Sequence, residues 1–117
     1  MVRAAVCREF GAPLSVEDIT VAAPAPGQVK VAVQACAVCH SDIHLTEGAW
    51  GGRLPAVYGH EAAGVVTELG DGVDAVAAGD RVVMSLIRSC GRCPSCQRGM
   101  PVGCSGDFAN DSRPLLT

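Results

Sequence analysis

The chain has 117 residues, which suffice for one small domain or for part of a larger one. Its net charge is −3 and it has a single lysine, Lys30, so it lacks the clustered positive charge that nucleic-acid phosphates require. No apolar run approaches the about 18 residues of a membrane-spanning helix, and the first residues lack the apolar stretch of a secretory signal. We therefore expect a cytoplasmic protein without a nucleic-acid or membrane partner.

Short β-branched or alternating stretches, separated by glycine and proline turns, predict a mainly β chain. The clearest is the strand in which Val29, Val31, Val33 and Ala35 alternate with more polar neighbours, which predicts a half-buried strand. In chain order, strands are expected at residues 2–7, 14–19, 29–36, 62–70 and 79–87, a short helix at 40–47, and a loop from residue 88. Short strands with frequent turns indicate a barrel or an irregular β-roll.

Seven cysteines are present, and an odd number argues against a complete disulfide framework. Without a secretory signal the thiols should stay reduced, and clustered reduced cysteines point to metal binding. No metal-binding or catalytic role is apparent for Cys7 or Cys36. We expect both to be small buried apolar residues.

The late cysteines Cys90, Cys93, Cys96 and Cys104 follow the pattern C-x2-C-x2-C-x7-C. Four thiolates can surround one zinc ion tetrahedrally and leave no open position, which defines a structural site. A seventeen-residue loop without a hydrophobic pattern cannot offset its own ordering entropy, whereas zinc binding of order 10 kcal/mol can. Four unrelated thiols, or an iron–sulfur cluster, are the alternatives.

A second cluster, CAVCHSDIHLTEG, spans residues 36–48. Its C-x-x-C could be a redox dithiol, but the flanking βαβ pattern of such proteins is missing. His60 could be an ordinary core histidine, or it could share a metal with the thiol of Cys39. His40 and His44 are four residues apart on one face of the expected helix, so they could also chelate one metal together.

Four features in a fixed order give the chain a family resemblance. They are VCHSD at 38–42, GHEAAGVVTELGDGV at 59–73, AGDRVV at 78–83 and the four-cysteine lobe. With them the chain resembles the N-terminal part of a zinc-dependent medium-chain alcohol dehydrogenase. The resemblance implies a GroES-like barrel, mainly β with short helices, that carries a zinc-binding cysteine lobe at 88–106.

The resemblance also implies roles around two zinc ions. Cys39 and His60 match two protein ligands of the catalytic zinc, and Glu61 matches a carboxylate beside that metal, able to approach it. Asp42 matches a carboxylate that hydrogen-bonds a ligating imidazole, that of His60. The structural zinc would be held by Cys90, Cys93, Cys96 and Cys104.

Further matches concern substrate and cofactor. Ser41 matches the hydroxyl that hydrogen-bonds the substrate oxygen and takes the alcohol proton, and His44 matches the imidazole that completes the proton relay. His40 stands where many members place a basic residue against the cofactor pyrophosphate. Trp50 falls where several members line the substrate pocket with an aromatic side chain.

Two family features have no counterpart among the 117 residues: a third catalytic ligand, which is a cysteine beyond the lobe, and the G-x-G-x-x-G fingerprint of a dinucleotide-binding domain. Residues 1–117 would thus form a partial GroES-like domain, truncated before the Rossmann domain. The complete enzyme would transfer hydride between a primary alcohol or aldehyde and NAD(P) and would be a homo-oligomer, and the chain alone would be inactive.

Two alternatives stay open. The chain could be a stand-alone zinc-binding β-barrel module without catalysis, in which Ser41 and His44 would be dispensable. It could instead belong to a reductase of aldehydes, quinones or thiol adducts within the same family.

Overall fold

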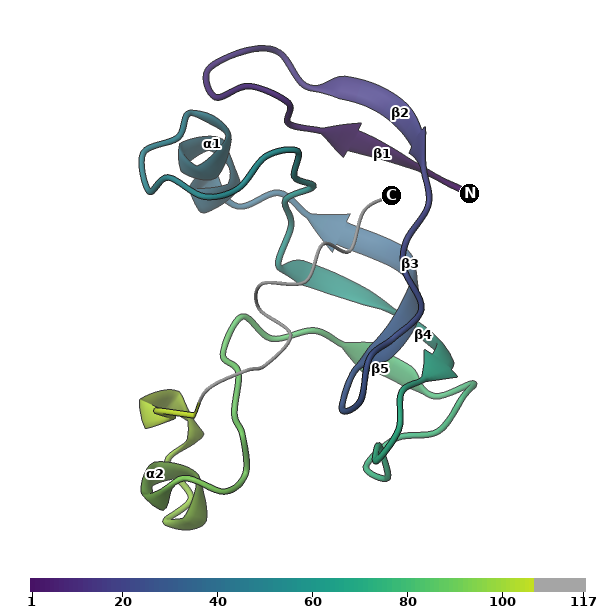
Figure 1. Cartoon of the computed structure of the whole chain (residues 1–117), viewed down its shortest axis with the longest axis vertical. Helices are drawn as coiled ribbons and strands as arrows, with labels where there is room; N and C mark the ends of the chain where they lie inside the picture. The colour runs from purple at the N-terminus through teal and green to yellow at the C-terminus, as the bar shows by residue number, and fades with distance from the viewer. Residues whose placement is uncertain (107–117) are drawn as a thin grey trace.

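The computed structural model describes residues 1–106, which form two antiparallel sheets and a few short helical segments (Figure 1). The mainly β fold expected from the sequence is confirmed. Among the described residues, no helix is long and apolar enough to cross a membrane. The elements are β1 (Val2–Val6), β2 (Ser15–Ile19), β3 (Val29–Ala37), α1 (His40–Thr46), β4 (Glu61–Leu69), β5 (Arg81–Val83), α2 (Pro94–Gln97) and η1 (Pro101–Gly103).

The strands pair in a simple order. β1 and β2 form an antiparallel hairpin, and β3, β4 and β5 form a three-stranded antiparallel sheet with β4 in the centre. At one end of that sheet Ala37 of β3 lies opposite Glu61 of β4. The end of β3 and the start of β4 are therefore neighbours, although more than twenty residues separate them in the chain.

The buried hydrophobic core of the described residues is small and consists of Val6, Cys7, Ala25, Ala62 and Val66. Cys7 exchanges backbone hydrogen bonds of 2.8 and 2.9 Å with Ala56, which extends β1 by one bridge. Its predicted burial is confirmed. The prediction for Cys36 is wrong: that residue is exposed, because its side chain lies on the face of β3 that lines an open groove.

That groove has a volume of about 820 Å³ and is lined by residues of the hairpin and of the three-stranded sheet, among them Val2, Ile19, Val33 and Met84. The strand β3 is confirmed, but Val33 is 56% exposed rather than buried. The alternation correctly predicted an apolar face. No part of the chain that the structure describes covers it.

Two glycines allow close approach between backbone segments. A Cβ atom on Gly64 would lie 2.2 Å from the carbonyl oxygen of Ala32 in the neighbouring strand, and one on Gly70 would lie 1.9 Å from that of Ala25. Neither backbone oxygen can move away as a flexible side chain would. The spaced glycines after His60 are therefore required by the packing of β4.

The last third of the described chain differs from the sequence prediction in two ways. β5 covers only Arg81–Val83 instead of residues 79–87, because β4 begins at Glu61 and offers no partner beyond the bond from Met84 N–H to Ala62 O. The segment expected to be a loop contains α2 and η1. Pro94 and Pro101 stand in the first turn of each, where a missing N–H costs nothing.

Candidate metal centres and the residues around them

The first candidate centre lies where β3 ends and β4 begins. Cys39 follows β3 by two residues and is the N-cap of α1, and His60 directly precedes β4. Because Ala37 and Glu61 are paired, the antiparallel sheet places the side chains of Cys39 and His60 at the same end of the sheet. Figure 1 shows α1 at this end of β3, beside the start of β4.

Three donor atoms converge there. The thiol of Cys39, an imidazole nitrogen of His60 and a carboxylate oxygen of Glu61 lie within 4.8 Å of one another. Sulfur, nitrogen and oxygen donors of this kind suit Zn²⁺, and three protein ligands with a free fourth position are typical of catalytic zinc sites. The donor set therefore fits the ion that the sequence implied.

Asp42 fixes both principal ligands at once. One carboxylate oxygen accepts the backbone N–H of Cys39 at 3.0 Å, which caps α1, and the other lies 3.1 Å from Nδ1 of His60. If Nδ1–H donates to Asp42, Nε2 keeps its lone pair for a metal. The predicted hydrogen bond between Asp42 and His60 is confirmed.

Ser41 completes the immediate surroundings, with its hydroxyl 3.4 Å from Nε2 of His60. Hydrogen bonds from the side chain and the backbone of Ser41, and from His60, lower the pKa of Cys39, against burial and the charge of Glu61. The hydrogen bond with Cys39 in turn raises the pKa of His60, supported by Asp42 and opposed by burial. Cys39 is thus favoured in the thiolate form that binds metals.

The remaining residues predicted for substrate and cofactor lie along α1 and the loop after it. The rings of His40 and His44 are in contact edge to face, with centroids 4.7 Å apart. The ring of Trp50 lies 5.5 Å from that of His44, and its side chain is 63% exposed. The three rings thus form one row beside the first centre, with His44 in the middle.

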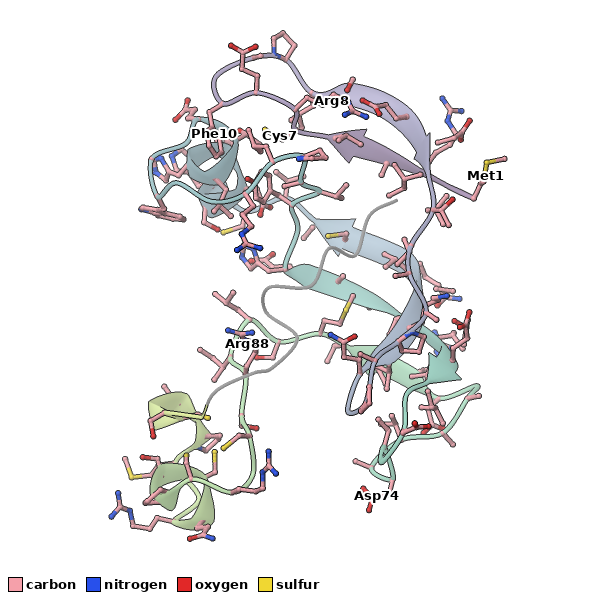
Figure 2. All side chains as sticks on the ribbon, viewed as in Figure 1. Met1, Cys7, Arg8, Phe10, Asp74 and Arg88 are labelled. Atoms are coloured by element: carbon pink, nitrogen blue, oxygen red, sulfur yellow. The ribbon has the colours of Figure 1, made fainter. Side chains whose placement is uncertain are left out.

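The position of α1 depends on contacts with the segment after β1. The N–H of Gly11 donates to the carbonyl of Thr46 at 2.9 Å, and Phe10 packs so closely on Gly48 that a Cβ there would lie 2.7 Å from its ring. Figure 2 shows Phe10 and Cys7 beside this helix. Gly48, which follows the helix, is therefore the surface on which Phe10 packs.

The second candidate centre is the lobe at residues 88–106. The four thiols of Cys90, Cys93, Cys96 and Cys104 lie within 4.8 Å of one another, and sulfur atoms gather beside α2 in Figure 2. None of the seven cysteines forms a disulfide. Four convergent thiols fit a closed tetrahedral zinc site.

Backbone N–H groups of the lobe already point at its sulfur atoms. Those of Arg92 and Cys93 donate to Sγ of Cys90 at 3.4 and 3.2 Å, and those of Cys90 and Gly106 donate to Sγ of Cys104 at 3.3 Å each. Such bonds spread the negative charge that four thiolates bring together. The loop geometry therefore provides N–H donors for negative charge at the sulfur atoms of Cys90 and Cys104.

The thiols of Cys93 and Cys96 differ widely in pKa. Backbone hydrogen bonds from Cys96 and Ser105 lower the pKa of Cys93 to about 6, whereas burial raises the pKa of Cys96 to about 11. Without a metal, Cys96 keeps its proton at neutral pH. Metal binding must displace that proton, so loading of this centre should strengthen as the pH rises.

The lobe has no hydrophobic core of its own. None of the buried residues of the described chain belongs to it, and α2 and η1 pack on each other and on no other helix or strand. Figure 1 shows both segments projecting away from the sheets. A bound metal would supply order to this segment.

Two features of the centres escaped the sequence analysis. Gly106 closes the lobe, since a Cβ there would lie 2.6 Å from the Cβ of Cys90. The sequence predicted that Asp42 contacts the imidazole of His60, but not that it also caps α1. Its position three residues after the N-cap is the spacing of a capping box, which could have revealed the cap.

Comparison with known proteins identifies this arrangement. Residues 25–112 match the family model described as "Alcohol dehydrogenase GroES-like domain". Alcohol dehydrogenase B of Mycobacterium tuberculosis (strain ATCC 25618 / H37Rv) is 48% identical over 99 residues, which are 84% of this chain and 26% of that protein. The chain thus spans about a quarter of the length of this curated relative.

Solved structures agree. An alcohol dehydrogenase zinc-binding domain protein from Burkholderia ambifaria has a TM-score of 0.86 at 39% identity, with coverage of 97% of this chain and 32% of that one. Benzyl alcohol dehydrogenase from Acinetobacter calcoaceticus has a TM-score of 0.80 at 34% identity, with coverage of 92% and 30%. The chain belongs to the alcohol dehydrogenase GroES-like domain family and corresponds to the N-terminal portion of a zinc-type medium-chain alcohol dehydrogenase.

Proposed function

We propose that this chain carries the substrate-activating part of a zinc-dependent alcohol dehydrogenase, which transfers hydride between a primary alcohol or aldehyde and NAD(P) in the complete enzyme. The observation that supports it most is the convergence of Cys39, His60 and Glu61 within 4.8 Å, with the Ser41 hydroxyl 3.4 Å from His60. A zinc ion bound there would act as a Lewis acid toward the substrate oxygen.

The protein's own residues prepare this site. Cys39 supplies a thiolate because hydrogen bonds with Ser41 and His60 lower its pKa. Asp42 orients His60 through Nδ1 and anchors Cys39 through its backbone N–H, so that both donors face the same point. Glu61 is exposed and adds a third donor that can approach or leave without disturbing a packed core.

The proposal includes a route by which the alcohol proton leaves the centre, through Ser41 and then His44. The hydroxyl of Ser41 adjoins the centre and can accept it while passing its own proton on. His44 lies one helical turn further along α1, at the i,i+3 position from Ser41, and its side chain is 43% exposed. An imidazole that is half in solvent can release the proton to water.

The substrate class proposed is a small or aromatic primary alcohol. Trp50 offers an exposed aromatic face beside His44, and an apolar ring can pack on such a face. A relative at 34% identity is named a benzyl alcohol dehydrogenase. A reductase direction toward aldehydes uses the same residues and remains within this proposal.

The cofactor part is proposed by family alone. His40 is exposed next to the centre and would face the pyrophosphate of NAD(P). The 117 residues contain no G-x-G-x-x-G sequence, so by themselves they should not form NAD(P)H from an alcohol. Reduced, unpaired cysteines favour the cytoplasm as the compartment, and the complete enzyme is proposed to be a homo-oligomer.

Cobalt substitution tests the proposal. With Co²⁺ in place of zinc, addition of benzyl alcohol should change the visible absorption of the first centre, because an open position accepts the oxygen. The change should vanish in Cys39→Ser and persist in Cys93→Ser if that variant still folds. A spectrum that benzyl alcohol leaves unchanged in the parent protein would favour the non-catalytic zinc module instead.

A further inference from the structure

We propose that His40 and His44 form a third metal site on the surface of α1, which takes one divalent transition ion of the Ni²⁺ or Cu²⁺ type through two imidazole nitrogens. They are four positions apart on the helix, so both side chains emerge on one face, one turn apart. Two histidines at this spacing on a helix are a known way to hold one metal ion.

The rings have the required separation and freedom. Their centroids are 4.7 Å apart at an interplanar angle of 81°. Two nitrogens that bind one ion at about 2.1 Å each lie about 3 Å apart in a bidentate arrangement, which a turn of each ring about its Cβ–Cγ bond can produce. Within residues 1–106, no hydrogen bond holds the ring of His40. Nδ1 of His44 lies 3.9 Å from a carboxylate oxygen of Glu47, which is too long for a hydrogen bond.

The surroundings favour a cation. The Glu47 carboxylate is 61% exposed and carries negative charge beside His44, so it can rotate toward a bound ion or offset its charge. His40 is exposed, so water can fill the remaining positions of the ion. Imidazole and water ligands suit Ni²⁺ and Cu²⁺, which by the Irving–Williams order bind such sites more tightly than the earlier divalent ions.

This site differs in kind from the two centres described above. Both of those contain cysteine thiols, and neither donor group includes His40 or His44. Zinc should therefore stay on the thiolates while Ni²⁺ or Cu²⁺ occupies the histidine pair. The binding itself is independent of the proposed function. One consequence rests on it: an ion on this pair would occupy both the relay imidazole and the cofactor-facing imidazole, and so would inhibit the complete enzyme.

Calorimetric titration of the zinc-loaded protein with Ni²⁺ tests the proposal. One further equivalent should bind in the parent protein. Loss of even an outer partner of a ligand typically weakens metal binding about 10-fold to 100-fold, so His44→Ala or His40→Ala should weaken it at least about 10-fold. Cys39→Ser, which disables the first centre, should leave the Ni²⁺ equivalent in place.

A matched control keeps the number of imidazoles and changes only their spacing. His40→Ala combined with Ile43→His places two histidines next to each other on the helix, where their side chains point to different faces. This double variant should bind Ni²⁺ as weakly as His40→Ala. Binding at parental strength in the double variant, loss of the equivalent in Cys39→Ser, or no third equivalent in the parent protein would overturn the proposal.

Discussion

Asp42 makes two side-chain contacts that together fix the geometry of the first centre. Its side chain is 14% exposed and holds the start of α1 and the ring of His60 with separate oxygens. A carboxylate on the far nitrogen of a ligating imidazole raises its basicity and fixes its tautomer. The geometry of the centre is thus set by a residue that binds no metal itself.

Replacing Asp42 by Asn separates these two contacts. The amide oxygen can still accept the N–H of Cys39, but the charge beside His60 is lost. We expect zinc at Cys39 and His60 to bind about 10-fold to 100-fold more weakly, while the lobe keeps its ion. Competitive zinc titration measures this, and NMR titration should show a lower pKa for His60, which a merely structural role would not produce. Asp18→Asn, at an exposed position of β2, is the matched control and should change neither quantity.

Glu17 of β2 provides a pH-dependent contact within the β1–β2 hairpin region. Hydrogen bonds from Arg8 and Ser15 lower the pKa of its carboxyl from 4.5 to about 2. Because the folded pKa is depressed, the stabilisation is complete above pH 4.5 and is lost as the pH falls through 2. A carboxyl-carbon NMR titration should therefore show a pKa near 2, which returns toward 4.5 in Arg8→Ala. The control Lys30→Ala breaks a separate ion pair, that between Lys30 and Glu68, and should leave Glu17 unaffected. An unchanged Glu17 pKa in Arg8→Ala would refute the assignment.

Among the elements, β4 positions the first centre, because it pairs with β3 and begins directly after His60. Its inner glycine permits that pairing. In Gly64→Ala the new Cβ would meet the carbonyl of Ala32 at 2.2 Å, so the strands must separate, and we expect a loss of about 1–3 kcal/mol or more in unfolding free energy. Denaturant unfolding measures it. In Gly103→Ala the nearest contact is an ordinary 3.5 Å, so the change should stay within about 0.5 kcal/mol.

The cysteine lobe should respond to chelation separately from the sheets, because it packs on no strand and has no buried residue of its own. Removal of the metal should speed hydrogen exchange in residues 88–106 first, while amides of β3 and β4 stay protected. The same protection pattern with and without chelator would show that the lobe folds without a metal. Cys104→Ser should reproduce the effect of chelation at this segment alone.

At the scale of the whole molecule, local patterns predicted more than long-range contacts. The alternation of Val29, Val31 and Val33 gave the right strand but the wrong burial, because burial depends on what covers a face and not on the strand itself. The length of β5 failed for a related reason: a strand ends where its partner ends, and the start of β4 is not visible in the sequence of β5.

The two donor groups were predicted on different grounds. The spacing of the late cysteines indicated the group around Cys90, whereas the group of Cys39, His60 and Glu61 was expected from the family resemblance. What the sequence could not supply was the geometry of the lobe: the N–H groups aimed at its sulfur atoms and the closure at Gly106. These depend on backbone paths that no motif specifies.

Zinc retained per chain tests the central claim most directly, namely that two separate donor groups in this chain hold zinc. After loading and gel filtration, elemental analysis should give about two ions per chain, one for each donor group, and about one in Cys39→Ser. A parent value near one that Cys39→Ser leaves unchanged would show that Cys39, His60 and Glu61 hold no zinc, and would contradict the account of the first centre.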